Sequence, residues 1–426
     1  MLDYRFIAEN LEAIKKNIAD RHMKADAEAV AALYAKRTKL STNLQALQQQ
    51  RNANAAAMKG KMEAIGREAL IEEGKKLKDS IAEAEAELLE TEAELEKEAR
   101  KIPNMAHPDA PVGREDSDNR ELRQVGKVPA FDFTPLDHVE LGRKLDIIDF
   151  DSGTKVSGTK FYYLKNEGVF LELGLIRYTL DFVQKKGFTP YITPDIAKTE
   201  ILEGIGFSPR GEESNIYALE GEETCLIGTS EITLGGYYSN MILPKDALPV
   251  RMAGLSHCYR REAGAAGQFS KGLYRVHQFT KLEMFVLCLP EDSENMHEEI
   301  CSIEEEIFKN LEIPFRVVDT CTGDLGAPAY RKYDLEAWMP GRGEAGDWGE
   351  VTSTSNCTDY QARRLNTRFK DSDGKNKFVH MLNGTAIAVS RALVAILENF
   401  QQSDGSVRIP KALVSYCGFD IIKAGR

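Results

Sequence analysis

The chain has 426 residues, which is enough for two or three domains, one of them with a large buried core. Its 42% of hydrophobic and 29% of charged residues exclude a disordered chain, and no apolar run reaches the length that spans a bilayer. The formal net charge of −12 requires any nucleic-acid site to gather its basic residues locally.

The N-terminus and the cysteines indicate the compartment. Residues 1–21 mix acidic and apolar side chains at helical spacing, unlike a secretion signal or a transit peptide. The seven cysteines are odd in number and scattered, without a C-x-x-C, so neither a disulfide framework nor a zinc site is indicated. We therefore expect a cytoplasmic protein, or a mature organellar protein whose leader has been removed.

A heptad pattern follows in two segments without glycine or proline, 27–59 and 75–102. One apolar face runs along both, formed by Leu33, Leu40, Leu44, Leu47, Leu70, Leu77, Ile81, Ala84, Leu88, Leu95 and Ile102. Gly60 and Gly66 predict a turn near 58–68. We expect an antiparallel two-helix coiled coil, an arm of about 50 Å that projects from its domain.

The charges on this arm are unevenly distributed. Basic residues gather around its tip, while the base, residues 83–98, is strongly acidic: the basic residues are Arg51, Lys59, Lys61, Arg67, Lys75, Lys76 and Lys78. The pattern has two interpretations, a spacer or dimerisation device with a solvated face, and an arm that reaches phosphate.

A linker and a second domain complete the chain. Proline occurs three times within nine residues, at 103, 108 and 111, which ends the helix and predicts an extended linker over 103–116. From 117 onward several β-type runs follow one another without helices between them, so we predict an α+β domain with an antiparallel sheet over 117–426. The N-terminal domain then covers 1–102. Neither familiar phosphate-binding glycine motif, G-x-G-x-x-G or G-x-x-x-x-G-K-[ST], is present.

The densest group of polar residues within an apolar context lies at 255–287. Arg260 and Glu262 alternate on one predicted strand and should share a face. A second predicted strand presents Arg275, His277, Phe279, Lys281 and Glu283 on one face. The segment is either a solvent-exposed sheet face with paired charges or a pocket that a ligand fills.

This segment resembles motif 2 of the class II aminoacyl-tRNA synthetases, in the form found in the seryl family: R-x-E, a glycine-bounded loop, then G-L-x-R-V-H-Q-F-x-K-x-E. L-N-G-T-A-I-A-V-S-R resembles motif 3, with Arg391 as its arginine, and G-F-T-P-Y-I-T-P resembles motif 1, ending at Pro194. The segments 229–231, 322–340 and 349–364 also resemble the family, as do the linker and the arm. The likeness covers nearly the whole chain in order, which is more specific than any single motif.

The resemblance implies a class II sheet domain flanked by helices and a serine–tRNA ligase reaction. Serine and ATP would form seryl-adenylate and pyrophosphate, and serine would then pass to the 3′-terminal adenosine of serine tRNA. It also implies ATP as substrate, Mg²⁺, a homodimer built around Pro194, and an arm that grips the long variable arm of the tRNA. The sequence leaves open whether selenocysteine tRNA is a second acceptor, and we expect no membrane partner.

The nucleotide site is carried over position by position. By resemblance, Arg260 bridges the serine carboxylate and the α-phosphate, which its planar fork suits better than a lysine would. Phe279 would stack under the purine with Arg391 on the opposite face, near the γ-phosphate. Arg260, Glu350 and Arg391 would be catalytic, and Glu350 and Ser353 would hold Mg²⁺. The implied ATP contacts are Arg260, Arg261, Glu262, Val276, Phe279, Glu350, Val351, Thr352, Ser353 and Arg391.

The other two implied sites follow in the same way. Serine would contact Thr229, Ser230, Glu231, Arg260, Glu283, Asn383 and Thr385. Transfer RNA would contact Arg51, Lys59, Lys61, Lys75, Lys76 and, near its acceptor end, Lys271. We interpret His277 as a packed, hydrogen-bonded histidine rather than a catalytic base.

The chain departs from the family in the motif-2 loop, where the usual Arg-Asp-Thr-Arg is replaced by Gln268, Phe269, Ser270 and Lys271. We expect activation to survive this change, and the acceptor-end contacts stay open. Two rival hypotheses remain. A serine-activating paralogue with a non-tRNA acceptor should lack the arm or its basic tip. A silent RNA-binding paralogue should have lost one of Arg260, Glu262, Glu283, Glu350 or Arg391.

Overall fold

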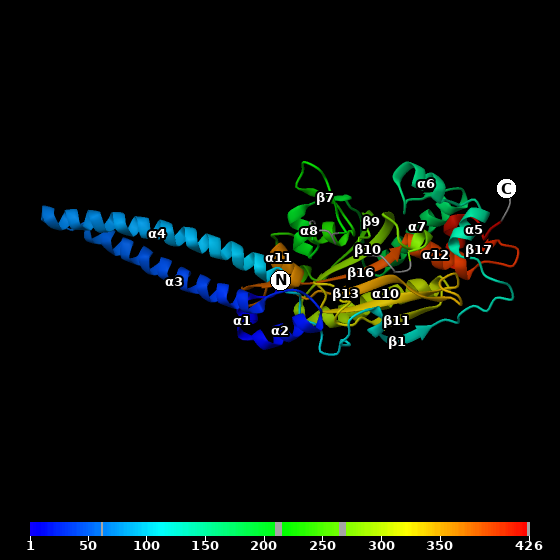
Figure 1. Ribbon diagram of the computed structural model, residues 1–426, viewed down its shortest axis with the longest axis horizontal. Coiled ribbons are helices and arrows are strands. Elements are labelled where there is room, and N and C mark those ends of the chain that lie inside the picture. The colour runs from blue at the N-terminus through cyan, green and yellow to red at the C-terminus, as the bar shows by residue number, and fades with distance from the viewer. Residues whose placement is uncertain (61–62, 209–214, 264–269, 424–426) are drawn as a thin grey trace. The chain divides into compact units, whose positions relative to one another are not determined.

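The computed structural model describes residues 1–60, 63–208, 215–263 and 270–423. It divides into two compact units, Met1–Met105 and Ala106–Arg426 (Figure 1). Of the described residues, none belongs to a helix long and apolar enough to cross a membrane.

The N-terminal unit is helical. Its helices are α1 (Tyr4–Glu9), α2 (Leu11–Asp20), α3 (Ala27–Ala57) and α4 (Ala64–Ala99). Aspartates cap two of them: Asp3 accepts hydrogen bonds from the first turn of α1, and Asp26 accepts one from Ala29 N of α3 at 2.9 Å. The Asp26 cap explains why the first long helix, α3, begins at Ala27.

Helices α3 and α4 lie side by side as a coiled coil (Figure 1), as the heptad pattern predicts. Seam residues Leu77, Ile81 and Leu95 are buried. Ion pairs join the two helices across the seam, Lys36–Glu87 and Arg37–Glu92, each at 3.0 Å. The predicted pair of long helices is confirmed.

One detail of the predicted turn is wrong. Helix α4 begins at Ala64, so Gly66 lies inside it instead of marking the turn. An exposed glycine costs a helix only about 1 kcal/mol relative to alanine, which packing of the apolar face against α3 offsets.

Within the described residues, the C-terminal unit is built on an eight-stranded sheet in the order β1-β11-β12-β13-β16-β10-β9-β4. The strands are β1 (Arg120–Val125), β11 (Phe315–Asp319), β12 (Arg331–Met339), β13 (Asp347–Asn356), β16 (His380–Ala388), β10 (Gln278–Cys288), β9 (Val250–Tyr259) and β4 (Thr189–Ile192). Neighbours are antiparallel except β4 and β9, which are parallel. The predicted α+β class with an antiparallel sheet is confirmed.

Helices α7 (Glu167–Lys185), α10 (Ser293–Asn310) and α12 (Val389–Asn399) cover one face of this sheet. The main core lies between them and alternate strand residues such as Met284 and Leu335. Gly384 lets β16 approach α10 closely, because a Cβ there would lie 2.3 Å from Ile300 Cγ2. The opposite face of the sheet carries polar as well as apolar side chains.

A smaller core lies on that opposite face, at one end of β9 and β10, where it contains Met252, Phe285 and Leu287. Helices α8 (Thr199–Ile205), α9 (Glu231–Tyr237) and α11 (Tyr360–Leu365) contribute to it. The remaining elements are α5 (His138–Lys144), β2 (Ile148–Asp149), α6 (Phe150–Ser157), β3 (Tyr163–Leu164), β5 (Ile196–Lys198), β6 (Tyr217–Ala218), β7 (Thr224–Leu226), β8 (Ile242–Pro244), β14 (Arg368–Lys370), β15 (Asn376–Phe378), β17 (Val407–Arg408), α13 (Lys411–Cys417) and β18 (Ile421–Ile422).

Candidate functional site

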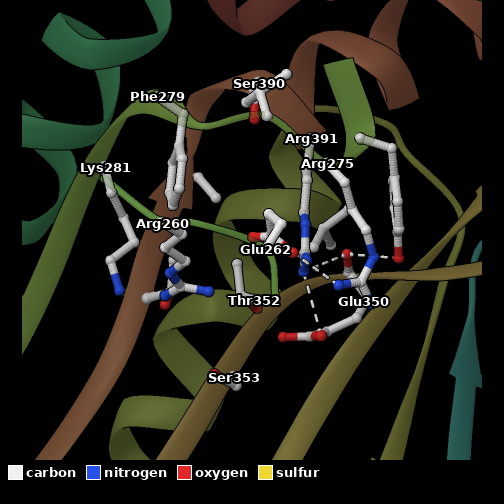
Figure 2. Close-up of a pocket in the computed structure, with 15 residues that line it drawn as sticks. Arg260, Glu262, Arg275, Phe279, Lys281, Glu350, Thr352, Ser353, Ser390 and Arg391 are labelled. Atoms are coloured by element: carbon white, nitrogen blue, oxygen red, sulfur yellow. Dashed lines mark hydrogen bonds and ion pairs between the residues drawn. The ribbon is translucent and has the colours of Figure 1, made fainter. Parts of the chain in front are cut away.

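A pocket of about 550 Å³ opens on the polar face of the sheet (Figure 2). Its walls combine cationic, acidic and aromatic side chains from β10, β13, β16 and α12 and from the segment between β9 and β10. The lining residues are Arg260, Glu262, Tyr274, Arg275, Val276, Phe279, Lys281, Glu350, Val351, Thr352, Ser353, Thr385, Ala388, Ser390 and Arg391.

Two of these residues lie just beyond a strand, which corrects the sequence prediction. Strand β9 ends at Tyr259, so Arg260 and Glu262 follow it and do not alternate along it. Glu262 has φ of +50°, a left-handed conformation that costs a residue with a side chain about 1–2 kcal/mol. An ion pair of 2.8 Å from Arg275 Nη1 to Glu262 Oε2 holds its carboxylate. Arg275 precedes β10, which begins at Gln278.

The Arg260 guanidinium lies against the Phe279 ring, 5.4 Å from its centroid, as Figure 2 shows. A cation over an aromatic face is attracted by the ring without using its hydrogen-bond donors. One of these donors, Arg260 Nε, binds the Gly228 carbonyl oxygen at 3.3 Å. His277 does not line this pocket: its Nδ1 lies 2.9 Å from the Arg260 carbonyl oxygen, and its ring packs near Phe161.

A bulge in the pairing of β12 with β13 shapes the other wall. Glu336 pairs with Glu350 and Leu335 with Thr352, which leaves Val351 as an extra residue. In a regular strand, residues 350 and 353 would point to opposite faces. The bulge brings Glu350 and Ser353 to the same face, where both line the pocket.

Arg391, the third residue of α12, reaches this wall. Its Nη1 lies 3.2 Å from Glu350 Oε2 and donates to the Glu350 carbonyl oxygen at 3.0 Å (Figure 2). Burial by itself raises the pKa of the Glu350 carboxyl, but Arg391 and Lys332 outweigh it, so the pKa falls below its usual range. Glu350 is therefore an anion in a strongly cationic pocket.

The implied metal fits this donor set. Glu350 and Ser353 offer a carboxylate and a hydroxyl on one face, and hard oxygen donors suit Mg²⁺. Two such residues would suffice, because Mg²⁺ in proteins usually keeps several water and phosphate oxygens beside one or two protein ligands.

A buried carboxylate cluster adjoins the pocket. Gly254 lets α9 lie directly on β9, since a Cβ there would be 2.8 Å from Ser230 Oγ, which donates to the Gly254 carbonyl. This contact brings Glu231 into the interior. Gln361 Nε2 and Asn383 Nδ2 donate to Glu231 Oε1 at 2.7 and 2.9 Å.

Charge repulsion and burial act on this cluster together. Burial raises the pKa of Glu231 to about 7, and the nearby Glu283 contributes to the rise. Glu283 pairs with Lys281 Nζ at 2.5 Å and accepts a hydrogen bond from Thr385 Oγ1 at 3.1 Å. Lys281 and Thr385 also line the pocket described above, so the two parts of the site meet there.

The structure brings together most residues expected for ATP. Arg260, Glu262, Phe279 and Arg391 line the pocket, with Val276, Glu350, Val351, Thr352 and Ser353. Arg261 is exposed and is not among the lining residues. Of the residues expected for serine, Arg260 and Thr385 line the pocket, and Thr229, Ser230, Glu231, Glu283 and Asn383 are buried beside it.

Some residues of the site were not predicted. Tyr274 and Ser390 line the pocket, and Gln361 fixes Glu231. Arg275 and Lys281, which were expected on the face of Phe279 without a stated ligand role, line the pocket too. Gln361 lies in the family-like segment 349–364, but no local pattern links it to Glu231, which is 130 positions away in the chain.

The residues expected to contact RNA are either exposed, outside the described residues, or held in an ion pair. Arg51, Lys59, Lys75 and Lys76 are exposed on or beside α3 and α4. Lys61 lies outside the described residues, as do Gln268 and Phe269 of the motif-2 loop. Lys271 forms an ion pair with Asp137, whose carboxylate also caps α5.

Comparison with known proteins extends this picture. The family model described as "Seryl-tRNA synthetase N-terminal domain" matches residues 1–106, and that described as "tRNA synthetase class II core domain (G, H, P, S and T)" matches residues 216–400. The chain is 67% identical over 422 residues to a serine–tRNA ligase from Treponema denticola, covering 99% of this chain and 100% of the relative. It is 59% identical over 422 residues to one from Treponema pallidum (strain Nichols), covering 99% of each.

Solved structures resemble the whole chain as well. A seryl-tRNA synthetase from Pyrococcus horikoshii, crystallised with ATP, superposes with a TM-score of 0.93 at 41% identity, over 100% of both chains. A cytoplasmic serine–tRNA ligase from Naegleria fowleri, in complex with AMP, superposes with a TM-score of 0.88 at 30% identity, over 100% of this chain and 99% of the other. The likeness therefore includes the two long helices as well as the sheet.

Proposed function

The chain belongs to the class II seryl-tRNA synthetases, and we propose that it is a serine–tRNA ligase that uses ATP and Mg²⁺. The observation that carries the proposal is one continuous site with two parts. A cationic pocket with an aromatic platform adjoins a buried carboxylate cluster, and Lys281 and Thr385 belong to both. The first part suits a nucleoside triphosphate and the second a small amino acid.

In the first step, a serine carboxylate oxygen attacks the α-phosphorus of ATP, and the bond from that phosphorus to pyrophosphate breaks. Such a transfer depends mainly on positioning and on charge stabilisation. Arg260 contacts both anions with its planar fork, and Phe279 stacks under the purine. Glu350 and Ser353 would hold Mg²⁺, which would supply positive charge to the phosphates, and Arg391 would lie near the γ-phosphate.

In the second step, a hydroxyl of the 3′-terminal adenosine of the tRNA attacks the carbonyl carbon of seryl-adenylate, and AMP leaves. The buried cluster selects the amino acid in both steps. A carboxylate of Glu231 or Glu283 binds the ammonium group, and a buried partner for the hydroxyl disfavours alanine strongly. Threonine is rejected by lack of room.

The N-terminal unit serves the tRNA. Exposed basic residues on α3 and α4 contact phosphates of the long variable arm, so that recognition depends on shape and backbone. The catalytic unit works as a homodimer through α7 and β4, where Phe170, Leu173 and Ile192 expose 57%, 55% and 87% of their surface. A cytoplasmic location, the use of selenocysteine tRNA, and contacts of Lys271 with the acceptor end stay predictions.

One experiment tests the function and both rivals. Serine-dependent exchange of pyrophosphate into ATP is measured beside charging of total tRNA with labelled serine. We expect both activities, with threonine and alanine giving little exchange. Exchange without charging selects a paralogue that loads another acceptor, and absence of exchange selects a silent RNA-binding paralogue.

A further inference from the structure

Arg391 rests on an aromatic ring that the family motifs did not single out. The carbon at the centre of its guanidinium lies 4.9 Å from the ring centroid of Tyr274, the last residue of the short 3-10 helix Gly272–Tyr274. A second guanidinium, that of Arg342, lies 5.1 Å from the same centroid. Two cations therefore contact one buried ring at the edge of the nucleotide pocket.

The ring is held by its surroundings. The Tyr274 hydroxyl donates to the Glu350 carbonyl oxygen at 3.3 Å, which joins the ring to the strand that carries the expected metal ligands. Gly349 packs closely against both side chains, because a Cβ there would lie 3.1 Å from the Tyr274 hydroxyl and 3.0 Å from Arg342 Nη1. Arg342 itself sits in the connection from β12 to β13, where Gly343 and Gly346 have left-handed φ values of +69° and +85°.

The contact with the Tyr274 ring matters because Glu350, the charged partner of Arg391, is also an expected Mg²⁺ ligand. Here Arg391 pairs with the Glu350 carboxylate at 3.2 Å, yet the proposed function gives that carboxylate to Mg²⁺. A neutral ring attracts a guanidinium without competing for metal or phosphate. Tyr274 can therefore keep Arg391 in place while its ion pair with Glu350 weakens.

We propose that Tyr274, backed by Arg342, positions Arg391 for the triphosphate of ATP. The two residues act through Arg391 and not on the reacting atoms, so they are positioning residues. The inference rests on the nucleotide site proposed above. It predicts an effect on nucleotide binding that is separate from serine binding, since the carboxylate cluster is built from other residues.

Four single variants of the full chain test this: Tyr274→Leu removes the ring, Tyr274→Phe removes only the hydroxyl, Arg342→Ala removes the second cation, and Arg408→Ala is the control. Arg408 lies 5.8 Å from the Phe400 ring and is not among the pocket-lining residues, so its replacement removes the same kind of interaction elsewhere. For each, the Kd for ATP is measured by calorimetry with and without Mg²⁺, and the KM values for ATP and serine by pyrophosphate exchange.

We expect Tyr274→Leu to raise the Kd and the KM for ATP about tenfold, as removal of a partly desolvated cation–π interaction implies. Tyr274→Phe keeps the ring and should change these constants no more than about threefold, with Arg342→Ala between the two. The KM for serine should stay within about twofold in all of them, and Arg408→Ala should match the wild type.

The inference is overturned if Tyr274→Leu binds ATP like the wild type, or if it raises the KM for serine as much as that for ATP. If Tyr274→Leu does not fold, an Arg342→Ala variant with unchanged ATP affinity overturns it instead. A wild-type chain that binds ATP but shows no serine-dependent exchange rejects the proposed function alone, because the Kd comparison still decides the role of Tyr274.

Discussion

Glu231 changes its charge within the pH range in which a synthetase is assayed. Burial, and then the neighbouring Glu283, raise its pKa to about 7, although a hydrogen bond from Gln361 lowers it in part. The carboxylate is ionised above that pH and becomes neutral below it. Only the ionised form can pair with the ammonium group of serine.

We therefore predict that kcat/KM for serine falls about tenfold from pH 8 to pH 6, following loss of the Glu231 charge. Pyrophosphate exchange at subsaturating serine measures this profile. Glu231→Gln keeps the shape without the charge and should give a slower reaction with a flat profile. An unchanged slope in that variant would assign the titration to another group.

The second prediction at the residue scale concerns Arg260. Its guanidinium lies over Phe279 and faces the pocket, so Arg260→Ala should lower the rate of adenylate formation by about 10² or more, the usual cost of removing a donor to transition-state charge. Arg260→Lys should recover little, because an ammonium cannot bridge two anions in a plane. Near-normal exchange by either variant contradicts the assigned role.

The residues of the site differ in how far sequence could predict them. Arg260, Glu262 and Phe279 were found because they share one motif, even though Arg260 and Glu262 lie beyond the strand expected to carry them. Gln361 and Tyr274 were missed as contributors. Their roles come from contacts with Glu231 and Arg391, which are distant in the chain, and such contacts leave no local periodicity.

At the scale of elements, two bulges decide which side chains of β13 and β16 face the site. The bulge at Val351 brings Glu350 and Ser353 together, and a second one, where Leu282 pairs with Ile387 but Glu283 with Thr385, places an extra residue in β16. Regular alternation predicts opposite faces for residues three apart. The strands were therefore predictable from their composition, whereas the register of the site depended on the fold.

The effect of a glycine on stability also depends on its surroundings, and alanine substitutions at Gly384 and Gly66 test this. Gly384→Ala places a Cβ 2.3 Å from Ile300 Cγ2 and 2.7 Å from Glu304 Oε1, so it should destabilise the catalytic unit by about 1–3 kcal/mol. Gly66→Ala has no neighbour within 4 Å and should stabilise α4 by up to about 1 kcal/mol. Calorimetric unfolding measures both, and a loss of stability in Gly66→Ala would contradict the helical assignment of that turn.

At the scale of the whole molecule, the exposed apolar residues of α7 and β4 predict the assembly state. Ile192→Asp places a charge where 87% of an isoleucine is exposed, so it should leave a single chain folded but separate a dimer into monomers. Val156→Asp is the control, since Val156 is 67% exposed on α6. Sedimentation of each variant gives its mass, and a single-chain mass for the wild type refutes the dimer.

The last prediction concerns the separation of tRNA binding, by the N-terminal unit, from serine activation, by the catalytic unit. Lys75 and Lys76 are exposed in the first half of α4, and Lys97 is exposed near its end, among acidic residues. Replacing Lys75 and Lys76 by alanine should weaken tRNA charging and reduce its salt dependence, by about 0.9 in the log–log slope for each phosphate that the variant no longer neutralises. Pyrophosphate exchange should not change, because activation uses only the pocket in the catalytic unit.

The control separates a specific contact from a general effect of charge. Lys97→Ala removes the same group from the same helix, so it should leave both charging and its salt slope as in the wild type. Equal reductions in charging for all three positions indicate a long-range field rather than direct binding of RNA phosphates. A parallel loss of exchange in the Lys75 and Lys76 variants contradicts the separation of RNA binding from activation.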